Sequence, residues 1–567
     1  MKTLLLSLRF TLLLLAVIAI YFPASAWNKT VTVDEIRYTI YVKGSHNDAV
    51  AQYAEVSGKS SDFSGHADIK PLITYEYKWS EYVNGEKVDY TLPLTAPVTS
   101  IYYHAFKDCT SLTSVTIPNS VTYIYKEAFK GCTNMISAII GNSVDTIGQY
   151  AFLGCTNLTE LTMGNSVKYI GPDAFSGCTS LASVNIPNSV SKIIDGAFSG
   201  CTSLSELTMG NSVKYIGSMA FSGCTSLKSV IIPNSLTSIA TSVFKDCTSL
   251  TSVTIPNSVE TIGNYAFKNC TSLTSVIIPN SVTTIKEYAF EHCSRLSELT
   301  IGKSVITMEN SFYNSNSIRK LVWNAVHCEK IKGSTYSFYT NNIEKVTIGD
   351  EVEFIPSYFV ENSKITEVSI PNSVTTIGRE AFYNCMSLKT LFWNAKNCVI
   401  DNDSFYYNNY PFYNCSGLAH IVVGSMVESI GNNMFCIAGI NNIDTVTCYA
   451  MVPPAITASC FERITYDNAQ LVVPEGTEDA YKKAPGWEEF NKDHISTITI
   501  IPGVDDQLLG DVNGDGMVDV LDVVVLVDYV LSKNPEPFVK ENADLNEDGK
   551  IDVVDVIVLI DRVLNGS

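Results

Sequence analysis

The sequence predicts a repeat solenoid, mainly β, with β caps at its ends and a small calcium-binding module after it. Two observations predict this architecture. First, nine cysteines between Cys109 and Cys293 follow one another at intervals of 23 residues. A fixed period of this length is typical of stacked repeats, in which each unit contacts only its neighbours. Second, two acidic loops with the spacing of calcium ligands occupy residues 511–522 and 544–555.

A single repeat contains the signals for one turn of such a solenoid. In the copy at 247–269, apolar and polar residues alternate through Val253, Thr254 and Ile255, which predicts a strand with one buried face. The segment Pro256-Asn257-Ser258 then provides residues that favour a turn. One unit cannot bury its own apolar side, so stacked units must build a continuous core.

The regular cysteines are expected to be buried, inert thiols. Their number is odd, and each repeat places its cysteine at the same position. Neighbouring turns would bring them about 4.8 Å apart with parallel Cβ vectors, which does not suit a disulfide. A disulfide stays possible among the later, irregular cysteines, which are Cys328, Cys385, Cys398, Cys415, Cys436, Cys448 and Cys460.

The motifs Pro-Asn-Ser-Val, Ile-Gly, Ala-Phe and Gly-Cys-Thr-Ser-Leu recur throughout this stretch. They closely resemble the BspA-type leucine-rich repeats of bacterial surface proteins, with a period of about 23 residues. The resemblance covers about 400 residues. It implies a secreted or surface-displayed recognition protein, without naming a ligand.

The first 26 residues are typical of a secretory signal peptide. Lys2 and Arg9 are basic, an apolar run follows, and Ala24-Ser25-Ala26 is a small-residue cleavage site. The alternative is a membrane anchor, but the apolar run is short for a membrane span. We therefore expect no membrane span after signal removal and a location that is secreted, extracellular or associated with the cell surface.

The remaining boundaries follow from where the 23-residue register begins and ends. Residues 27–100 lack it, and Arg37–Val42 and Tyr82–Val88 predict a strand and a hairpin. Residues 444–500 resemble the closing segment of the repeat family. The predicted organisation is a signal peptide at 1–26, an N-terminal β cap at 27–100, a solenoid at 101–443, a C-terminal cap at 444–500, a linker at 501–509 and a calcium-binding module at 510–567.

The outward positions of the repeat strands are mostly small and polar. This predicts a flat, hydroxyl-rich face, which is either a docking surface for a protein or glycan or simply a solvated strand face. The positions are Thr113, Ser114, Thr116, Thr159, Glu160, Thr162, Ser205, Glu206, Thr208, Thr251, Ser252 and Thr254.

Aromatic residues gather later in the solenoid. Trp323 and Trp393 occupy positions held by isoleucine elsewhere, so we expect them in the core. Phe392 falls on the outward row. It could form a contact patch with Tyr406, Tyr407, Tyr410 and Tyr413, or these residues could pack under irregular loops.

The two acidic loops contain the clearest chemistry. Calcium takes six to eight oxygen ligands from a bent 12-residue loop, with glycine at position 6 and a backbone carbonyl at position 7. Both loops satisfy this pattern, with Gly516 and Gly549 at the bend. We predict two Ca²⁺ ions, held by Asp511, Asn513, Asp515, Met517, Asp519 and Asp522 and by Asp544, Asn546, Asp548, Lys550, Asp552 and Asp555.

This paired loop resembles a type I dockerin, a small all-α module of two EF-hand-like loop-helix units that docks onto a cohesin. The runs at 523–528 and 556–561 are β-branched and by propensity favour strands, but the resemblance implies helices started by Asp522 and Asp555. Dockerins contact cohesin partly through loop positions 10 and 11, often with hydroxyl residues. Here these positions are Val520, Leu521, Val553 and Val554, which points to a more apolar interface.

Composition and motifs limit the function. The net charge of −20 argues against nucleic-acid binding. The sequence contains no H-E-x-x-H metalloprotease motif, no G-x-S-x-G hydrolase motif and no phosphate-binding glycine loop. A glycosidase needs two carboxylates facing each other across a cleft, whereas the repeated Glu160, Glu206 and Glu298 share one row. We therefore predict no enzyme activity, but a recognition or adhesion protein attached through its dockerin. The alternative is an accessory or cryptically hydrolytic subunit of a cellulosome-like, polysaccharide-degrading complex.

Overall fold

The computed structural model describes residues 27–43, 50–59, 65–83, 86–328, 330–332, 342–401, 410–436 and 443–498. Near the C-terminal end it describes 512, 520–531, 538, 540, 543, 545 and 550–565. The predicted signal peptide lies outside these ranges. The chain divides into two compact units, residues 1–273 and 274–567.

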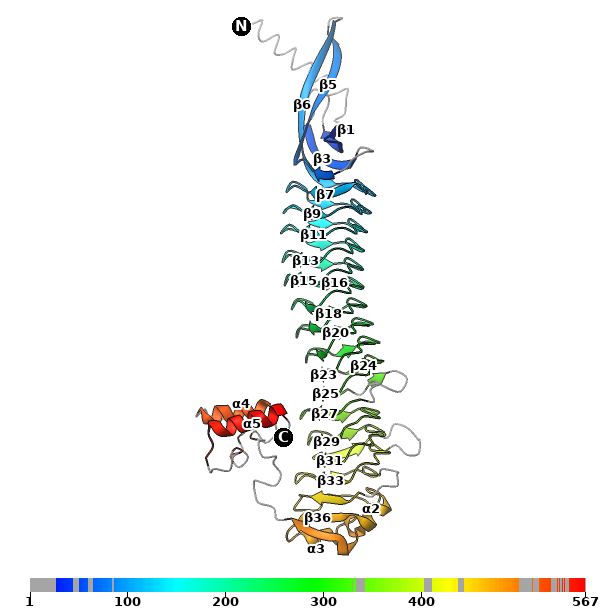
Figure 1. The fold of residues 1–567 in the computed structure, drawn as a ribbon, viewed down its shortest axis with the longest axis vertical. Coiled ribbons are helices and arrows are strands. Elements are labelled where there is room, and N and C mark those ends of the chain that lie inside the picture. Colours follow the sequence, from blue (N-terminus) through cyan, green and yellow to red (C-terminus); the bar gives the residue numbers. More distant parts are fainter. Residues whose placement is uncertain are drawn as a thin grey trace, which may run out of the picture. The chain divides into compact units, whose positions relative to one another are not determined.

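The first unit begins with long strands, followed by stacked turns (Figure 1). The strands are β1 (Trp27–Val33), β2 (Ile36–Lys43), β3 (Val50–Lys59), β4 (Gly65–Asp68), β5 (Leu72–Val83) and β6 (Glu86–Ile101). β5 and β6 pair antiparallel from Leu72↔Pro97 to Val83↔Glu86, so the predicted hairpin is confirmed. The predicted strand at 37–42 lies within β2 and is also confirmed.

Each regular turn contributes one strand to each of two parallel rows. The first row is β7 (Leu112–Thr116), β9 (Ser137–Ile139), β11 (Glu160–Thr162), β13 (Ser183–Ile186), β15 (Glu206–Met209), β17 (Ser229–Ile231) and β19 (Ser252–Thr254). The second row is β8 (Tyr123–Ile124), β10 (Thr146–Ile147), β12 (Tyr169–Ile170), β14 (Lys192–Ile193), β16 (Tyr215–Ile216), β18 (Ser238–Ile239) and β20 (Thr261–Ile262). β4 pairs with β7 and β6 pairs with β8, so the long strands supply the first member of both rows.

The second unit repeats this plan. One row is β21 (Ser275–Ile277), β23 (Glu298–Ile301), β25 (Lys320–Trp323), β27 (Lys345–Ile348), β29 (Glu367–Ile370), β31 (Thr390–Trp393), β33 (His420–Val423), β35 (Thr445–Cys448), β36 (Gln470–Pro474) and β37 (Ile495–Ile498). The other is β22 (Thr284–Ile285), β24 (Thr307–Glu309), β26 (Lys330–Lys332), β28 (Phe354–Ile355), β30 (Thr376–Ile377), β32 (Asn397–Ile400) and β34 (Ser429–Ile430).

The last strands of the second unit are joined by short helices, and two longer helices follow. The short ones are α2 (Arg463–Asn468), α3 (Glu478–Tyr481), η1 (Trp487–Glu489) and η2 (Lys492–His494). The longer pair is α4 (Val520–Val530) and α5 (Val553–Asn565). No described helix is both long and apolar enough to cross a bilayer.

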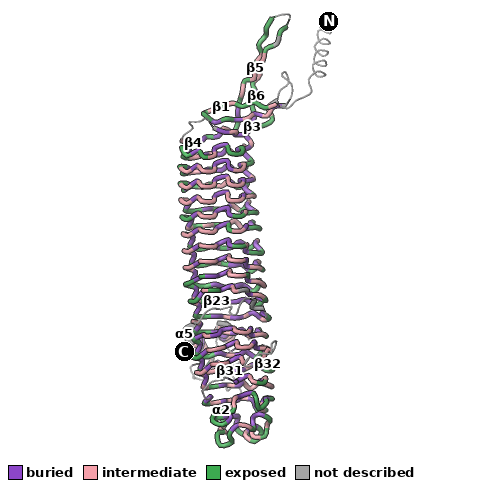
Figure 2. Tube along the Cα trace, turned by 90° about the vertical axis from the view of Figure 1, so that its right-hand side faces the viewer, coloured by how far each residue is buried: buried purple, intermediate pink, exposed green. Residues whose placement is uncertain are grey.

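The interior of the turns is built from buried side chains, and Figure 2 shows buried positions recurring from turn to turn. Phe106, Phe129, Phe152, Phe175, Phe198, Phe221, Phe244 and Phe267 form a continuous ladder with ring centroids 4.9–5.7 Å apart. Trp323 and Trp393 are fully buried, which confirms their predicted place in the core. One turn therefore provides only part of a hydrophobic core, and its neighbours complete it.

All sixteen cysteines are buried reduced thiols, including the irregular ones. From Cys132 to Cys270 each regular sulfur donates to a phenylalanine carbonyl of the preceding turn, as Cys132 Sγ does to Phe106 O at 3.1 Å. Burial raises the pKa of Cys201 to about 12. These cysteines therefore act as small apolar groups whose thiol S–H, a weak donor, is hydrogen-bonded to a backbone carbonyl, and they are unreactive, as predicted for the regular ladder.

A row of asparagines stabilises the turns. The side-chain oxygen of Asn119 accepts the backbone N–H of Asn142 at 2.7 Å, and Asn142 does the same for Asn165 at 3.2 Å. Asn188 and Asn211 repeat the bond at 3.0 Å. Side chains of this kind satisfy turn amides that the strands leave unpaired.

Candidate functional site

The C-terminal helices form a small module with its own core. Buried Leu526 of α4 and Leu559 of α5 pack with four further buried residues, Val512, Ala543, Leu545 and Val556. The rings of Tyr529 and Phe538 stack at 4.0 Å. A core of this size buries little apolar surface, so it provides little free energy to offset the cost of burying charged loop residues.

The second acidic loop is closed by the carboxylate of Asp555. Its Oδ1 accepts the backbone N–H of Leu545 at 2.8 Å, and its Oδ2 accepts that of Asp552 at 2.9 Å. These bonds bring the backbone amides of loop positions 2 and 9 to the carboxylate at position 12. A buried final carboxylate that gathers backbone groups in this way fits a calcium-binding loop.

The helices begin two residues before the predicted starts, so the expectation that Asp522 and Asp555 start them is wrong. Asp552 Oδ1 accepts the backbone N–H of Val554 at 2.8 Å, the bond that an N-cap residue makes. Position 9 of the loop therefore caps α5. Asp555 lies in the first turn of the helix, where a negative charge is favourable.

The described ranges contain four of the predicted calcium-binding residues. Asp522 and Asp555 are fully buried, Asp552 is half-buried and Lys550 is exposed. The others lie outside the described residues: Asp511, Asn513, Asp515, Met517, Asp519, Asp544, Asn546 and Asp548. Carboxylates are buried at the last position of both loops, and burying an acid requires compensating partners, which for Asp555 include the backbone N–H groups of Leu545 and Asp552.

An apolar stripe covers one exposed side of α5. Val553, Val554, Ile557 and Ile560 share it, and Ile557 is 60% exposed. In α4 the equivalent of Ile557 is Val524, which is 52% exposed. Of the four predicted partner-contacting residues, Val553 and Val554 are thus accessible, whereas Val520 and Leu521 lie in the first turn of α4 and their side chains lie outside the description. Exposed apolar side chains at this helical spacing are typical of an interaction surface.

The outward strand positions of the solenoid face solvent, as the alternation predicts. Thr113, Glu160, Thr208 and Ser252 are exposed. Ile231, in the same row as Thr208 and Thr254, is also exposed. Among the later aromatics, Tyr410 and Tyr413 contact each other at 6.4 Å, Phe392 is half-buried in β31, and Tyr406 and Tyr407 fall outside the described residues.

A tyrosine cluster that the sequence reasoning missed lies in the first unit. Tyr102, Tyr103, Tyr123 and Tyr125 have neighbouring ring centroids 4.3–5.5 Å apart. One residue in the sequence could have indicated this cluster, because it interrupts the repeat pattern. Tyr125 stands where the next turns have Gly148 and Gly171, because Ile124 pairs with Ile147 and Ile147 with Ile170.

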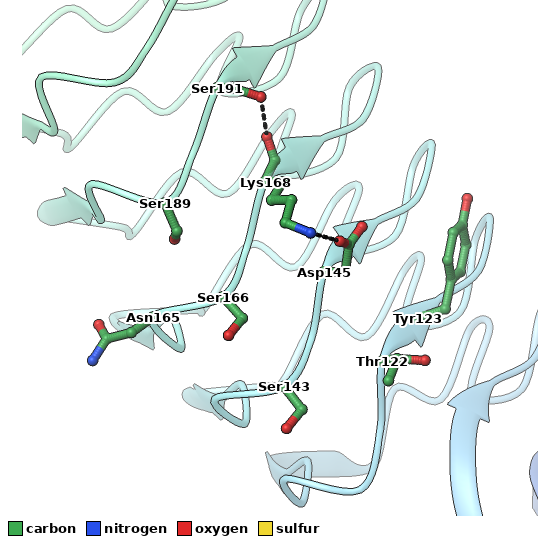
Figure 3. Close-up of a pocket in the computed structure, with 9 residues that line it drawn as sticks. All are labelled: Thr122, Tyr123, Ser143, Asp145, Asn165, Ser166, Lys168, Ser189 and Ser191. Atoms are coloured by element: carbon green, nitrogen blue, oxygen red, sulfur yellow. Dashed lines mark hydrogen bonds and ion pairs between the residues drawn. The ribbon is translucent and has the colours of Figure 1, made fainter.

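Beside this cluster lies a shallow polar groove of about 840 Å³, lined by Thr122, Tyr123, Ser143, Asp145, Asn165, Ser166, Lys168, Ser189 and Ser191 (Figure 3). Lys168 Nζ and Asp145 Oδ2 form an ion pair at 2.8 Å across adjacent turns. The hydrogen bond from the Lys168 ammonium, followed by that from the Thr146 hydroxyl, lowers the pKa of Asp145. The groove thus presents hydroxyls, one amide and a neutralised pair of charges.

Family models match both the repeat region and the C-terminal module of the chain. The model of the BspA type leucine rich repeat region matches in six copies, over residues 89–205, 193–320 and 329–467. The model of the dockerin type I domain matches residues 509–564. A comparison with curated proteins gave no match.

Several solved structures are similar to this chain. A leucine-rich repeat protein from Bacteroides ovatus is 24% identical, with 83% of this chain and 100% of that chain covered and a TM-score of 0.48. A leucine rich cell surface protein from Faecalibacterium prausnitzii is 23% identical, with 69% and 94% covered and a TM-score of 0.37. The T. pallidum leucine rich repeat protein is 24% identical, with 43% and 91% covered and a TM-score of 0.28. Because the model of the repeat region matches most of the length of this chain, the chain belongs to the BspA type leucine rich repeat family, and it carries a type I dockerin domain at its C-terminal end.

Proposed function

We propose that this is a secreted, non-catalytic recognition or adhesion protein. Its repeat solenoid binds a protein or glycan, and its dockerin attaches it to a cohesin on a scaffold or cell surface. The observation that carries the proposal is the dockerin match at 509–564 behind a solenoid. Leucine-rich repeats and dockerins both mediate protein–protein interaction, and neither family is typically catalytic.

In the proposed docking step, calcium binding provides the free energy that folds the module. Type I dockerins bind calcium. In this chain Asp511, Asp515, Asp519 and Asp522 would hold one ion, and Asp544, Asp548, Asp552 and Asp555 the other, with Asn513, Asn546 and the carbonyls of Met517 and Lys550. Bound calcium would supply the positive charge that lets these carboxylates approach one another. Asp555 and Asp552 already organise the second loop through their backbone bonds.

We further propose that the cohesin contact is largely apolar. The exposed Val553, Val554, Ile557 and Ile560 of α5 provide the surface. Their burial against a partner would be favourable by about 25 cal/mol per Å² of apolar area. This interface depends on α5 being formed, so docking requires calcium if calcium folds the module.

The test uses the full chain and a set of immobilised cohesin modules from the parent organism. Binding is measured with calcium and with EGTA, and hydrogen exchange is followed in α4 and α5 and in the repeats. We expect binding with calcium only, and loss of protection with EGTA confined to the two helices. The variant Asp511→Ala with Asp544→Ala should behave in calcium as the wild type does in EGTA.

A matched control removes two exposed carboxylates elsewhere. Asp467→Ala with Asp479→Ala changes the net charge equally but touches only surface ion pairs. This control should bind cohesin normally. Equal folding and docking of the wild type in EGTA would refute the calcium-dependent step, and failure to bind any cohesin would refute the attachment.

A further inference from the structure

The tyrosine cluster of the first unit, here called the tyrosine platform, is an exposed aromatic surface. It consists of Tyr102, Tyr103, Tyr123 and Tyr125, and the first three are each at least 36% exposed. Their rings meet at angles from 39° to 90°, so they make a continuous but uneven surface. Such a surface exposes ring faces and hydroxyl groups together, a combination that suits amphipathic ligands.

A buried carboxylate, Glu55, lies near this platform and raises the pKa of Tyr125, after the larger effect of burial. Glu55 is 8% exposed and accepts two hydrogen bonds, from Tyr41 Oη at 3.1 Å and from Ser100 Oγ at 3.0 Å. Tyr41 stacks on Tyr53 at 4.7 Å, and burial with the nearby Glu55 raises the pKa of Tyr41 to about 12. Ser100 pairs with Tyr123 across neighbouring strands, so the carboxylate is linked through Ser100 to the strand that carries Tyr123. A platform whose strands are held in this way loses little backbone freedom when a ligand binds.

The polar groove continues from the platform along successive turns. Tyr123 belongs to both (Figure 3). Thr122, Asp145, Lys168 and Ser191 occupy one column, because each backbone N–H donates to the carbonyl of the residue before it in that column. Figure 3 shows Ser143, Ser166 and Ser189 in a second, roughly parallel column. The groove thus offers one set of hydrogen-bonding groups per turn, at a turn spacing of about 4.8 Å.

We propose that the platform and groove bind a neutral, extended glycan of β-linked pyranose rings. This rests on the proposed recognition function of the solenoid and assigns it a site and a ligand class. A pyranose ring has a C–H face that packs on an aromatic ring and hydroxyl edges that pair with Ser, Thr, Asn, Asp and Lys. The turn spacing is close to the length of one such ring along a β-linked chain, so consecutive rings would meet consecutive turns.

The same features disfavour other ligands. The groove contains one acid and one base, already paired, so it provides no excess charge for an anionic ligand. Its columns are lined by hydroxyls instead of the apolar pockets into which the aromatic anchors of a protein partner insert. In the first column Thr122 and Ser191 already donate to the carbonyls of Thr99 and Lys168, but an entirely apolar ligand would cover the serines of the second column without forming hydrogen bonds to them.

The test measures binding of β-1,4-glucan, β-1,4-mannan and β-1,4-xylan oligosaccharides of four to six rings to the full chain in calcium, by calorimetry. We expect at least one to bind. Tyr103→Ala with Tyr123→Ala should weaken it at least tenfold, and Tyr103→Phe with Tyr123→Phe should keep most of the affinity, because the ring faces remain. Both tyrosines are exposed, so the variants should fold, which hydrogen exchange of the regular turns verifies.

The matched control is Tyr215→Ala. Tyr215 occupies the same strand position as Tyr123, four turns further on, and is 45% exposed, but it lies outside the platform and the groove. It should bind the oligosaccharide as the wild type does. The inference is overturned if no oligosaccharide binds, if the alanine pair binds normally, or if the platform proves to bind only a protein. Cohesin docking measured on the same sample distinguishes this failure from failure of the attachment.

Discussion

Replacing Phe221 by alanine should damage the solenoid strongly but locally. Phe221 is fully buried, and its ring lies 5.4 Å from Phe198 and 5.7 Å from Phe244. Removing a buried phenylalanine costs about 3–5 kcal/mol, because the lost transfer free energy adds to the cavity left behind. A loss of this size raises the local opening equilibrium constant by about 100- to 4,000-fold.

The assay is hydrogen exchange of single amides in the wild type and in Phe221→Ala. Informative reporters are the amides of Phe198, Phe221 and Phe244, which donate to Ala220, Val243 and Ala266 at 2.8–3.0 Å. We expect faster exchange at these amides and little change several turns away, since each repeat contacts only its neighbours. Lys214→Ala, at an exposed position of the same turn, should change the local free energy by less than about 0.5 kcal/mol.

Two results would refute this reasoning. Uniform loss of protection throughout residues 101–273 would mean that the stack unfolds as one cooperative unit. A loss below about 1 kcal/mol would mean that the turns close over the missing ring, so that the phenylalanine ladder is not a stiff core element.

Three further predictions concern other parts of the chain. In urea without reductant, the nine cysteines from 109 to 293 should all react with a thiol reagent, and few should react in the folded protein; extensive disulfides would contradict the structure. Burial, together with nearby Glu380, raises the pKa of Glu361 to about 7, so between pH 4.5 and 7 the native state binds more protons than the unfolded state. Local stability around Glu361 should therefore fall by about 2–3 kcal/mol as pH rises from 5 to 8. Glu361→Gln should remove most of that dependence in hydrogen exchange, and the raised pKa of the nearby Glu380 accounts for the rest; an unchanged pH profile in the variant would refute it. Ile557→Ser should weaken cohesin binding by about 1–2 kcal/mol in calorimetry, while Lys540→Ser, also at an exposed position of the module, should not; equal effects would exclude a specific apolar contact.

The interior of the solenoid could be predicted from the sequence because every turn must satisfy the same packing requirement. A buried ring, thiol or isoleucine must match its counterpart in the next turn, so the 23-residue period marks Phe221, Cys224 and their equivalents as core. The two tryptophans were identified for the same reason, as replacements for isoleucine in that register.

The dockerin helices show where local propensity is a poor guide. The runs of valine, isoleucine and leucine favour strands when considered alone, yet they form α4 and α5. Burial of Leu526 and Leu559 in a shared core outweighs the propensity. The start of α5 depends on the cap bond that the backbone N–H of Val554 donates to Asp552 Oδ1, and a spacing rule that assigns Asp552 to calcium does not reveal it.

The tyrosine platform was missed because it depends on contacts that a repeat period does not encode. Tyr41, Tyr53 and Glu55 come from strands that precede the repeats, and only folding brings Glu55 beside Ser100. From the sequence, Tyr125 is visible only as an irregular residue in place of a glycine.

The contrast between inward and outward columns explains why recognition sites escape the periodic pattern. In the second row of the first unit, the inward column reads Ile101, Ile124, Ile147, Ile170, Ile193 and Ile216, all of them buried. The column beside it reads Ser100, Tyr123, Thr146, Tyr169, Lys192 and Tyr215. A change in the inward column would leave a cavity or a clash in two neighbouring turns, whereas most of the outward positions have no such constraint. Side chains on the outward columns are therefore free to be specialised for a ligand. The platform lies where the tyrosine of this column, Tyr123, stands in the same turn as Tyr125, which replaces the glycine of the next two turns.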